Sequence, residues 1–253
     1  MSWGSRRQGL YLGSGLILLL VAGTLFYFLV IYRAPSCMDG VKNGSETGVD
    51  CGGNCQNLCP AETLAPTILW SRSFEVAPGV WNAAAYVENH NGNAGARQLR
   101  YRFRIFEAGN VLIVERVGMT FLAPGSAAVI VEPSMLVGER KPLLTQFEFL
   151  ELPQWEKISD GAVPDITVQS SELTNAETLP RISAVARNRS LFDVAAVEAT
   201  AIVYDAEDNA IAVSKTLLPS LQRGEEKQIV FTWPKPFTTS PTRIDVRARA
   251  SFK

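Results

Sequence analysis

Histidine is nearly absent from the chain: His90 is the only one among 253 residues. A single histidine excludes an HExxH zinc pair, a multi-histidine metal site and a two-histidine relay. Serines and threonines do not occur in G-x-S-x-G or S-x-x-K order, and there is no glycine-rich phosphate loop. We therefore expect a protein that is not an enzyme and that has no small-molecule substrate. His90 itself lies in a turn-like string and is expected to be solvated.

An excess of charge is also lacking, since 24 lysines and arginines face 25 acidic residues. Such a balance gives no general attraction to nucleic acid, and we expect no nucleic-acid partner. One short stretch does gather positive charge, on four arginines: Arg97, Arg100, Arg102 and Arg104. We interpret this stripe as a solvated strand face whose charges pair with glutamates such as Glu88 and Glu115.

Charge is absent from one long apolar run, Tyr11 to Tyr32 (YLGSGLILLLVAGTLFYFLVIY). At about 1.5 Å of rise per residue, a helix of this length crosses a hydrocarbon core of roughly 30 Å. Arg6 and Arg7 precede the run and Arg33 follows it, which favours a cytoplasmic N-terminus. We expect residues 1–10 to be a cytoplasmic tail and residues 11–32 to be a single transmembrane helix.

Two other leader types compete with this signal-anchor interpretation. A cleaved signal peptide has an apolar core of about 7–15 residues and a small-x-small cleavage site, and this run is longer and lacks that site. A lipoprotein signal would place small residues before Cys37, but Arg33 lies unfavourably close. We therefore expect an uncleaved anchor in the cell membrane, with everything after it extracytoplasmic.

All four cysteines, Cys37, Cys51, Cys55 and Cys59, follow the apolar run closely. Their spacing, C-x13-C-x3-C-x3-C, lacks the C-x2-C pairs typical of zinc sites and of redox centres. Outside the cell the cysteines meet an oxidising compartment. We expect two disulfides, in one of the three connectivities that four cysteines allow.

Four residues between the cysteines carry side-chain oxygens at short spacing: Asp39, Asn43, Glu46 and Asp50. Calcium takes six to eight oxygen ligands, so these residues are a candidate calcium site, although the EF-hand pattern is absent. The alternative is that aspartate, asparagine and glycine serve only as turn formers in a segment too short to have a core. Both alternatives stand, and no other cofactor is expected.

The stretch from Cys37 to Cys55 resembles the CxDGxxNGxETxxDCGGxC module, which occurs beside membrane anchors and between domains of secreted and surface proteins. The resemblance implies extracellular placement more than any one activity. We interpret residues 33–66 as a cysteine-rich spacer, ending in the short stiff linker PAETLAP at residues 60–66.

Strand patterns dominate the rest of the chain. Leu99 to Ile105 alternates apolar residues with arginines, as in a strand with one face in a core and one in water. Five further segments have strand character: Trp81–Val87, Ile182–Ala186, Ala199–Tyr204, Lys227–Trp233 and Arg243–Phe252. Short strands separated by Gly, Pro, Asn and Asp predict a mainly β protein built of sandwiches.

The strand-rich part contains an internal repeat. Asn89 and Asn188 lie 99 positions apart within similar segments, and Gly125 and Gly224 lie 99 apart after proline-bearing loops. A strand-rich unit repeated at this spacing predicts two tandem immunoglobulin-like β-sandwich domains. We place them at residues 67–153 and 163–253.

The second copy ends one strand with Ile202-Val-Tyr-Asp205, followed by a turn at residues 206–209. This order resembles the bacterial FxLYD family of small extracytoplasmic β-sandwiches, although Ala201 stands where that motif has its first aromatic residue. The first copy departs further, with Phe106-Glu107 in place of Tyr-Asp. The resemblance implies non-catalytic modules of bacterial envelope proteins.

Four tryptophans, Trp70, Trp81, Trp155 and Trp233, are expected to pack in cores or at domain junctions rather than to bind sugars, with Trp155 as a wedge between the domains. The function we expect is that of a membrane-anchored, extracytoplasmic, non-catalytic structural or interaction protein of the cell envelope. Its partners would be the membrane and other envelope or surface proteins. The alternative is a calcium-dependent surface adhesin.

Overall fold

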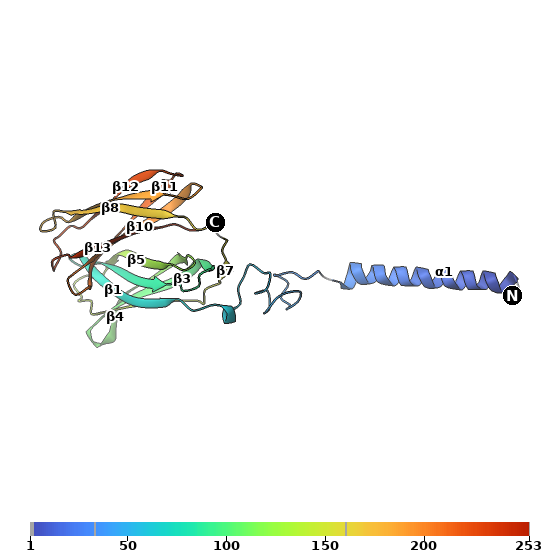
Figure 1. Ribbon diagram of the computed structural model, residues 1–253. Coiled ribbons are helices and arrows are strands. Elements are labelled where there is room, and N and C mark those ends of the chain that lie inside the picture. The colour runs from blue at the N-terminus through green and yellow to red at the C-terminus, as the bar shows by residue number, and fades with distance from the viewer. Residues whose placement is uncertain (1–2, 33, 160, 253) are drawn as a thin grey trace. The chain divides into compact units, whose positions relative to one another are not determined.

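The computed structural model describes residues 3–32, 34–159 and 161–252 (Figure 1). Arg33, which the predicted orientation uses, lies outside these residues. The chain divides into two compact units, residues 1–55 and 56–253, and each is described by itself. The first contains the helix and most of the cysteine-rich segment, and the second contains all the strands.

The apolar run forms helix α1 (Trp3–Phe26), which continues as a π-helical turn, η1 (Tyr27–Ile31). Its described side chains are exposed all round, and no part of the span is buried by protein. A helix that is apolar on every face needs an apolar environment. It is long and apolar enough to be a membrane anchor, and a signal sequence would have the same character.

Within its described residues, the second unit contains thirteen strands and two short 3-10 turns, η2 (Pro60–Glu62) and η3 (Ala108–Asn110). The strands of the first half are β1 (Thr67–Ala77), β2 (Val80–Glu88), β3 (Ala94–Glu107), β4 (Val111–Leu122), β5 (Ala127–Leu136), β6 (Leu144–Phe149) and β7 (Glu156–Lys157). Those of the second half are β8 (Ile166–Thr174), β9 (Arg181–Asn188), β10 (Val194–Tyr204), β11 (Ala210–Leu221), β12 (Glu226–Thr232) and β13 (Arg243–Arg249).

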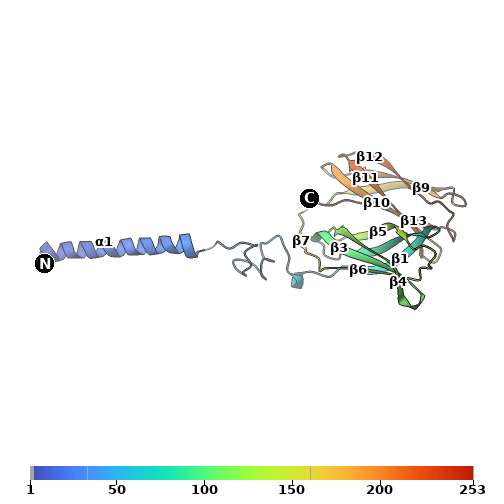
Figure 2. The ribbon, with the colours of Figure 1, turned by 180° about the vertical axis from the view of Figure 1, so that it is seen from behind.

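The strands pair antiparallel into four small sheets, which Figures 1 and 2 show from opposite sides. Sheets β1-β2-β5 and β4-β3-β6 enclose one core, around Leu99 and Phe103. Sheets β12-β9-β8 and β11-β10-β13 enclose a second, around Ile182 and Phe231. The fold is therefore mainly β and consistent with two β-sandwich domains, as predicted, and we call them the first and second sandwich.

The strand order confirms the internal repeat. In each sandwich the first, second and fifth strands form one sheet, and the fourth, third and sixth form the other. The six predicted segments all fall on strands, except that Arg243–Phe252 leaves the sheet after Arg249 and Trp233 lies just beyond β12. The remaining strands were not among the predicted segments: β1, β4, β5, β6 and β7 in the first sandwich, and β8 and β11 in the second.

Asn89 and Asn188 occupy the same place in the two sandwiches and make the same hydrogen bonds. Both are buried, at 2% and 0% exposure. Each amide nitrogen donates to two backbone carbonyls, those of Ala94 and Ala123 for Asn89 and those of Phe192 and Leu221 for Asn188, at 2.8–2.9 Å. Each side-chain oxygen accepts the N–H two residues further on, from Asn91 and Ser190. One asparagine thus joins three chain segments in each copy.

The two glycines that repeat at the same spacing, Gly125 and Gly224, lie close to these asparagines. Gly125 and Gly224 have positive φ angles, 54° and 75°, a backbone region that favours glycine. The N–H of Gly224 donates to the Asn188 carbonyl at 3.0 Å, and that of Gly125 donates to the Asn91 carbonyl at 2.8 Å. The sequence repeat therefore reflects shared hydrogen bonds of a buried asparagine as well as a common fold.

Replacing Asn188 with alanine should lower the free energy of unfolding by about 3 kcal/mol, because it leaves two buried carbonyls and one N–H without partners. Urea unfolding of the full chain in detergent micelles, followed by tryptophan fluorescence, measures this. Asn93→Ala, in the exposed turn before β3, is the matched control and should change stability by less than about 1 kcal/mol. Equal effects of the two variants would contradict the assigned role of Asn188.

Candidate functional site

The two sandwiches pack against each other, sheet on sheet. A third apolar cluster, the junction cluster, lies between sheets β1-β2-β5 and β11-β10-β13 and draws from both sandwiches: Phe74, Ala84, Val129, Val131, Ile202, Tyr204, Ala210 and Val213. All eight are buried. In Figure 1 the facing sheets form the inner layers of the second unit.

The central strands on either side of the junction are buried on both faces. In β2, Ala83 and Ala85 face the first core while Ala84 belongs to the junction cluster, and all three are fully buried. In β10, Val203 faces the second core and Ile202 the junction. Alternate residues of a strand point to opposite faces, so each of these strands contributes side chains both to the core of its own sandwich and to the junction cluster.

The junction joins sheets that are not equivalent in the repeat. Ile202 in the junction corresponds, at the 98-residue spacing of β3 and β10, to Arg104 on the open face of the first sandwich. Ala84 corresponds, 99 residues away, to half-buried Ser183 of β9. At these two positions the sequence places an apolar side chain on the sheet face that meets its neighbour and a polar one on the equivalent outer face.

Arg249 of β13 ties the second sandwich to the first. It forms an ion pair with Glu198 of its own sheet, at 2.6 Å from Nη2 to Oε2. It also donates to the Thr120 hydroxyl and to the Phe121 carbonyl, each at 3.0 Å, across the junction. Its guanidinium lies 4.5 Å from the centre of the Phe121 ring. A charged group with this many partners is stabilised in its partly buried position.

Further polar contacts cross the same boundary. Lys215 Nζ donates to the Val131 carbonyl at 2.9 Å, and Asn82 Nδ2 donates to the Val213 carbonyl at 3.2 Å. Both reach main-chain acceptors, whose positions are fixed by the sheets. The apolar cluster is therefore flanked by directional bonds that set how the two sheets are aligned.

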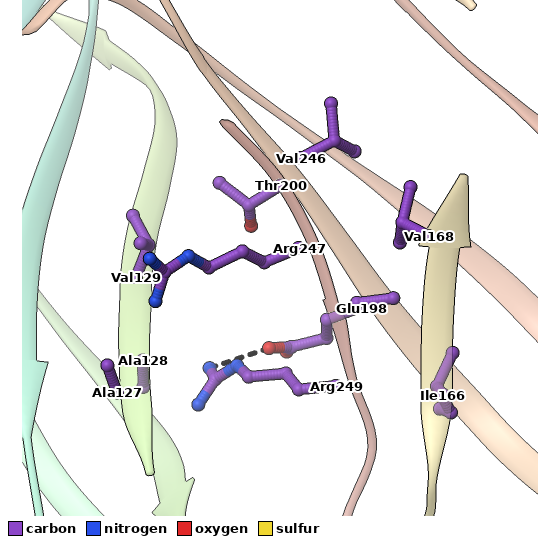
Figure 3. A pocket seen from close by; sticks show the side chains of 11 residues that line it. Ala127, Ala128, Val129, Ile166, Val168, Glu198, Thr200, Val246, Arg247 and Arg249 are labelled. Atoms are coloured by element: carbon purple, nitrogen blue, oxygen red, sulfur yellow. Dashed lines mark ion pairs between the residues drawn. The ribbon is translucent and has the colours of Figure 1, made fainter. Parts of the chain in front are cut away.

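A cavity of about 280 Å³ opens between the sandwiches beside Arg249 (Figure 3). In Figure 3 the side chain of Arg247 extends from β13 toward Val129 of β5, and that of Arg249 extends toward Ala127 and Ala128 of the same strand. Arg247 pairs with Asp245 at 2.8 Å and lies 5.0 Å from the Tyr86 ring centre. The charged groups of this cavity are therefore engaged in joining the sandwiches.

Tyr101 of β3 is held as a neutral donor inside the first sandwich. Its hydroxyl donates to Glu132 Oε1 at 2.7 Å. Burial, and next the bond to Glu132, raise the pKa of Tyr101 well above its ordinary value. A Cβ at Gly118, on the neighbouring strand β4, would collide with the Tyr101 ring, which explains a glycine in the middle of a strand.

The chain joins the β unit through a short added strand pairing. Leu58 N–H donates to the Trp155 carbonyl, and Lys157 N–H to the Gln56 carbonyl, both at 2.8 Å. Further on, the predicted linker is tied to the first sandwich, because Leu64 exchanges two hydrogen bonds with the Asn91 side chain. The residues after Gln56 are thus part of the β unit.

The four tryptophans pack in cores or at the junction, as predicted. Trp155, at 5% exposure, belongs to the first core and not to the junction cluster, so its expected role as a wedge between the domains is not what the packing shows. Trp233 belongs to the second core, Trp81 packs against the first, and Trp70 packs against the junction cluster.

Three of the four arginines of the stripe, Arg97, Arg102 and Arg104, pair with glutamates. Arg102 contacts Glu148 at 2.6 Å and Glu115 at 3.5 Å, and Arg104 contacts the same Glu148 at 3.0 Å. The predicted partner Glu115 is thus confirmed. The other predicted partner, Glu88, instead lies 3.5 Å from His90.

Two more sequence predictions concern nearby groups. Arg97 pairs with Glu156 at 2.9 Å. The side chain of His90 is 48% exposed, as expected for a solvated turn histidine.

The cysteine-rich segment of the first unit is held by disulfides. Cys37 and Cys55 are bonded, with their Cα atoms 5.6 Å apart, which selects this pair among the connectivities the sequence allows. Cys51 and Cys59 are also oxidised, and no described cysteine is free. Glu46 lies near the Cys37 and Cys55 sulfurs, but a disulfide offers no thiolate to a metal.

The four candidate calcium ligands lie in one loop, and their side chains make hydrogen bonds within that loop. Asp50 accepts the N–H groups of Asp39 and Gly40, at 2.9–3.1 Å. Asp39 accepts the Asn43 amide at 2.7 Å, and Glu46 accepts the Asn43 backbone N–H at 3.2 Å. The carboxylates thus already close the turns of the loop, and a calcium site at these residues stays a prediction.

Comparisons with known proteins add little. No family model matches the chain, and no curated protein matches it. One solved structure, a glycosyl hydrolase family 2 member from Bacteroides cellulosilyticus, is 9% identical with a TM-score of 0.21. The match covers 87% of this chain and 34% of that one, so the chain spans about a third of its length. A likeness this low supports no inference about activity.

Gly53→Ala should prevent correct oxidation of the cysteine-rich segment. Gly53 has φ +55°, and an added Cβ would collide with the Ser45 backbone carbonyl. Gly40→Ala is the matched control, because Gly40 also has positive φ (+74°) but no atom lies within 4 Å of its added Cβ. It should cost only about 1–2 kcal/mol. Counting free thiols by alkylation and mass spectrometry distinguishes them, and equal thiol counts would refute the steric explanation.

Proposed function

We propose that the chain is a single-pass membrane protein of the cell envelope, with a cytoplasmic N-terminus and a non-catalytic structural or interaction role outside. The apolar helix and the oxidised cysteines support this, since disulfides persist in oxidising compartments. They favour a secreted or membrane-anchored extracytoplasmic protein, and the 22 uncharged residues of the run favour the anchor.

The observation that carries the proposal is the junction. A chain of two freely jointed domains would leave its facing sheets polar, whereas here eight buried apolar residues and several hydrogen bonds connect them. Such packing fixes the spacing of the surfaces that the two sandwiches present. A protein that holds binding surfaces at a fixed spacing suits an envelope assembly, and its open sheet edges and loops are the surfaces available to partners.

Membership of the FxLYD-like sandwiches is part of the proposal. Tyr204, the tyrosine of the resembling segment, is buried in the junction cluster, and the Arg243 guanidinium lies 3.7 Å from its ring centre. Asp205 accepts the N–H groups of Glu207 and Asn209 and so closes the hairpin turn between β10 and β11. These two roles give the Tyr-Asp pair a physical reason within this chain.

The proposal is tested by crosslinking in native membranes, followed by capture of the tagged full-length chain and mass spectrometry. We expect a defined set of envelope proteins, recovered equally from calcium-containing and chelator-treated cells. Recovery of the chain alone from cells that display it would contradict the proposal. Binding to other cells that chelation abolishes would instead support the alternative, a calcium-dependent adhesin.

Ala84→Leu should loosen the junction, because added volume between two packed sheets costs about 1–3 kcal/mol. The matched control is Ser183→Leu, at the equivalent position on the outer face of the second sandwich. Small-angle scattering of the full chain in nanodiscs should show a larger radius of gyration for Ala84→Leu only. An unchanged scattering curve and unchanged unfolding midpoint for Ala84→Leu would show that the junction does not hold the sandwiches together.

A further inference from the structure

Phe252, beyond the end of β13, packs on the first sandwich and not on its own. β13 ends at Arg249, and residues 250–252 follow it outside the sheet. Phe252 is nevertheless 3% exposed, and it belongs to none of the three apolar clusters. Its ring therefore occupies a place of its own, which we call the Phe252 site, and we call residues 250–252 the strap.

A missing side chain on β3 makes room for the Phe252 ring. A Cβ added at Gly95 would lie 2.6 Å from Cζ of Phe252 and 3.1 Å from Cγ1 of Ile158. A glycine within a strand often marks a place where another group approaches closely. The Phe121 ring stands roughly perpendicular to that of Phe252, with the ring centres 6.5 Å apart. The site is thus an apolar pocket that depends on Gly95 having no side chain.

Arg97 binds the main chain of the strap as well as its ring. Arg97 Nη1 donates to the Phe252 carbonyl at 2.7 Å, and the guanidinium lies 4.8 Å from the centre of the Phe252 ring. The same guanidinium pairs with Glu156 of β7 at 2.9 Å, and Glu156 also accepts Gln56 Nε2 at 3.3 Å. The site therefore recognises an aromatic side chain together with its own carbonyl, and it adjoins the segment where the chain joins the β unit.

The repeat shows that the strap is separable from the sandwich fold. After β6 the chain places Trp155 in the core of its own sandwich, whereas after β13 it places Phe252 against β3 of the other one. Ala250 still belongs to the second core, and Ser251 is exposed. Beyond Ala250 the strap is thus held chiefly through Phe252. A segment held by one side chain opens more readily than a paired strand.

We propose that the Phe252 site is a peptide-binding site of the first sandwich and that the strap is its displaceable occupant. The ligand is an extended segment with one aromatic side chain, whose carbonyl accepts the Arg97 N–H. While Phe252 is docked, Arg97 links the second sandwich to Glu156 and through it to Gln56. A competing segment of this kind breaks that link. The inference goes beyond the proposed envelope role and does not depend on it.

The test is hydrogen exchange followed by mass spectrometry, on the full chain in nanodiscs. Phe252→Ala empties the site, and amide exchange in residues 94–97 and 156–158 should become about tenfold faster, because β7 is only two residues long and opens locally. Residues 182–186, in the second core, should exchange at an unchanged rate. Ser251→Ala, at the exposed neighbour of Phe252, is the matched control and should change neither region.

A peptide supplied in trans shows whether the emptied site binds a ligand. A chain shortened by residues 251–253 is titrated with the capped tetrapeptide ASFK, the sequence of residues 250–253, or with ASAK. ASFK alone should restore the slow exchange, with a Kd on the order of a millimolar. The intact chain should not respond over the same range, because the tethered strap has the higher effective concentration.

Two glycine variants of the shortened chain separate the pocket from the fold. Gly95→Ala fills the space of the Phe252 ring and should abolish the response to ASFK. Gly92→Ala, where an added Cβ meets no atom within 4 Å, should respond as the shortened chain does. Exchange in residues 182–186 should be the same in both variants.

The proposal is overturned if Phe252→Ala leaves exchange in residues 94–97 and 156–158 unchanged. It is also overturned if exchange in residues 182–186 rises equally, since Phe252 would then contribute only to overall stability. Failure of ASFK to restore slow exchange at about ten times the expected Kd, or equal restoration by ASAK, would show that the site binds no aromatic segment.

Discussion

The architecture of the second unit depends on one constraint: the central strands β2 and β10 must bury both of their faces. Three consecutive alanines in β2, Ala83 to Ala85, satisfy it in the first sandwich, because their side chains are small enough for a sheet to approach on either side. β10 satisfies it with Ala201 toward the second core and Ile202 toward the junction. Alanine has a low intrinsic preference for strands, so tertiary packing and not local propensity decides this region.

The same constraint explains how the polar residues are distributed. Charged groups near the junction reach a partner or a main-chain carbonyl, as Arg249 and Lys215 do, because an unmade bond there is costly. On the outer face of the first sandwich the arginines meet glutamates in water, where each pair contributes little to stability. The indole N–H of Trp233 is an exception, because it is buried without a hydrogen-bond partner among the described residues.

Much of the fold follows from the sequence, and the reasons are local. Alternation at Leu99 to Ile105 predicts a strand whose one face is wet, and the 99-residue spacing of Asn89 and Asn188 predicts the duplication. The junction was not predicted. The sequence does carry a trace of it, because equivalent positions of the two repeats differ in polarity, as Ile202 and Arg104 do. This difference can be interpreted only when the strand order shows which sheets are equivalent. The cavity beside Arg249 is lined by side chains from both sandwiches, and no spacing in the sequence reveals it.

The pairing of unlike sheets has a consequence for assembly. When the front of one repeat meets the back of the next, the contact is directional and has no rotational symmetry to close it, so identical repeats would keep adding to form a fibre. Here the two outward faces carry Arg104 with its glutamate partners at one end and Ser183 at the other, in place of the apolar residues of the inner faces. Polar side chains at these two positions make a further sheet-on-sheet contact less favourable there than at the junction.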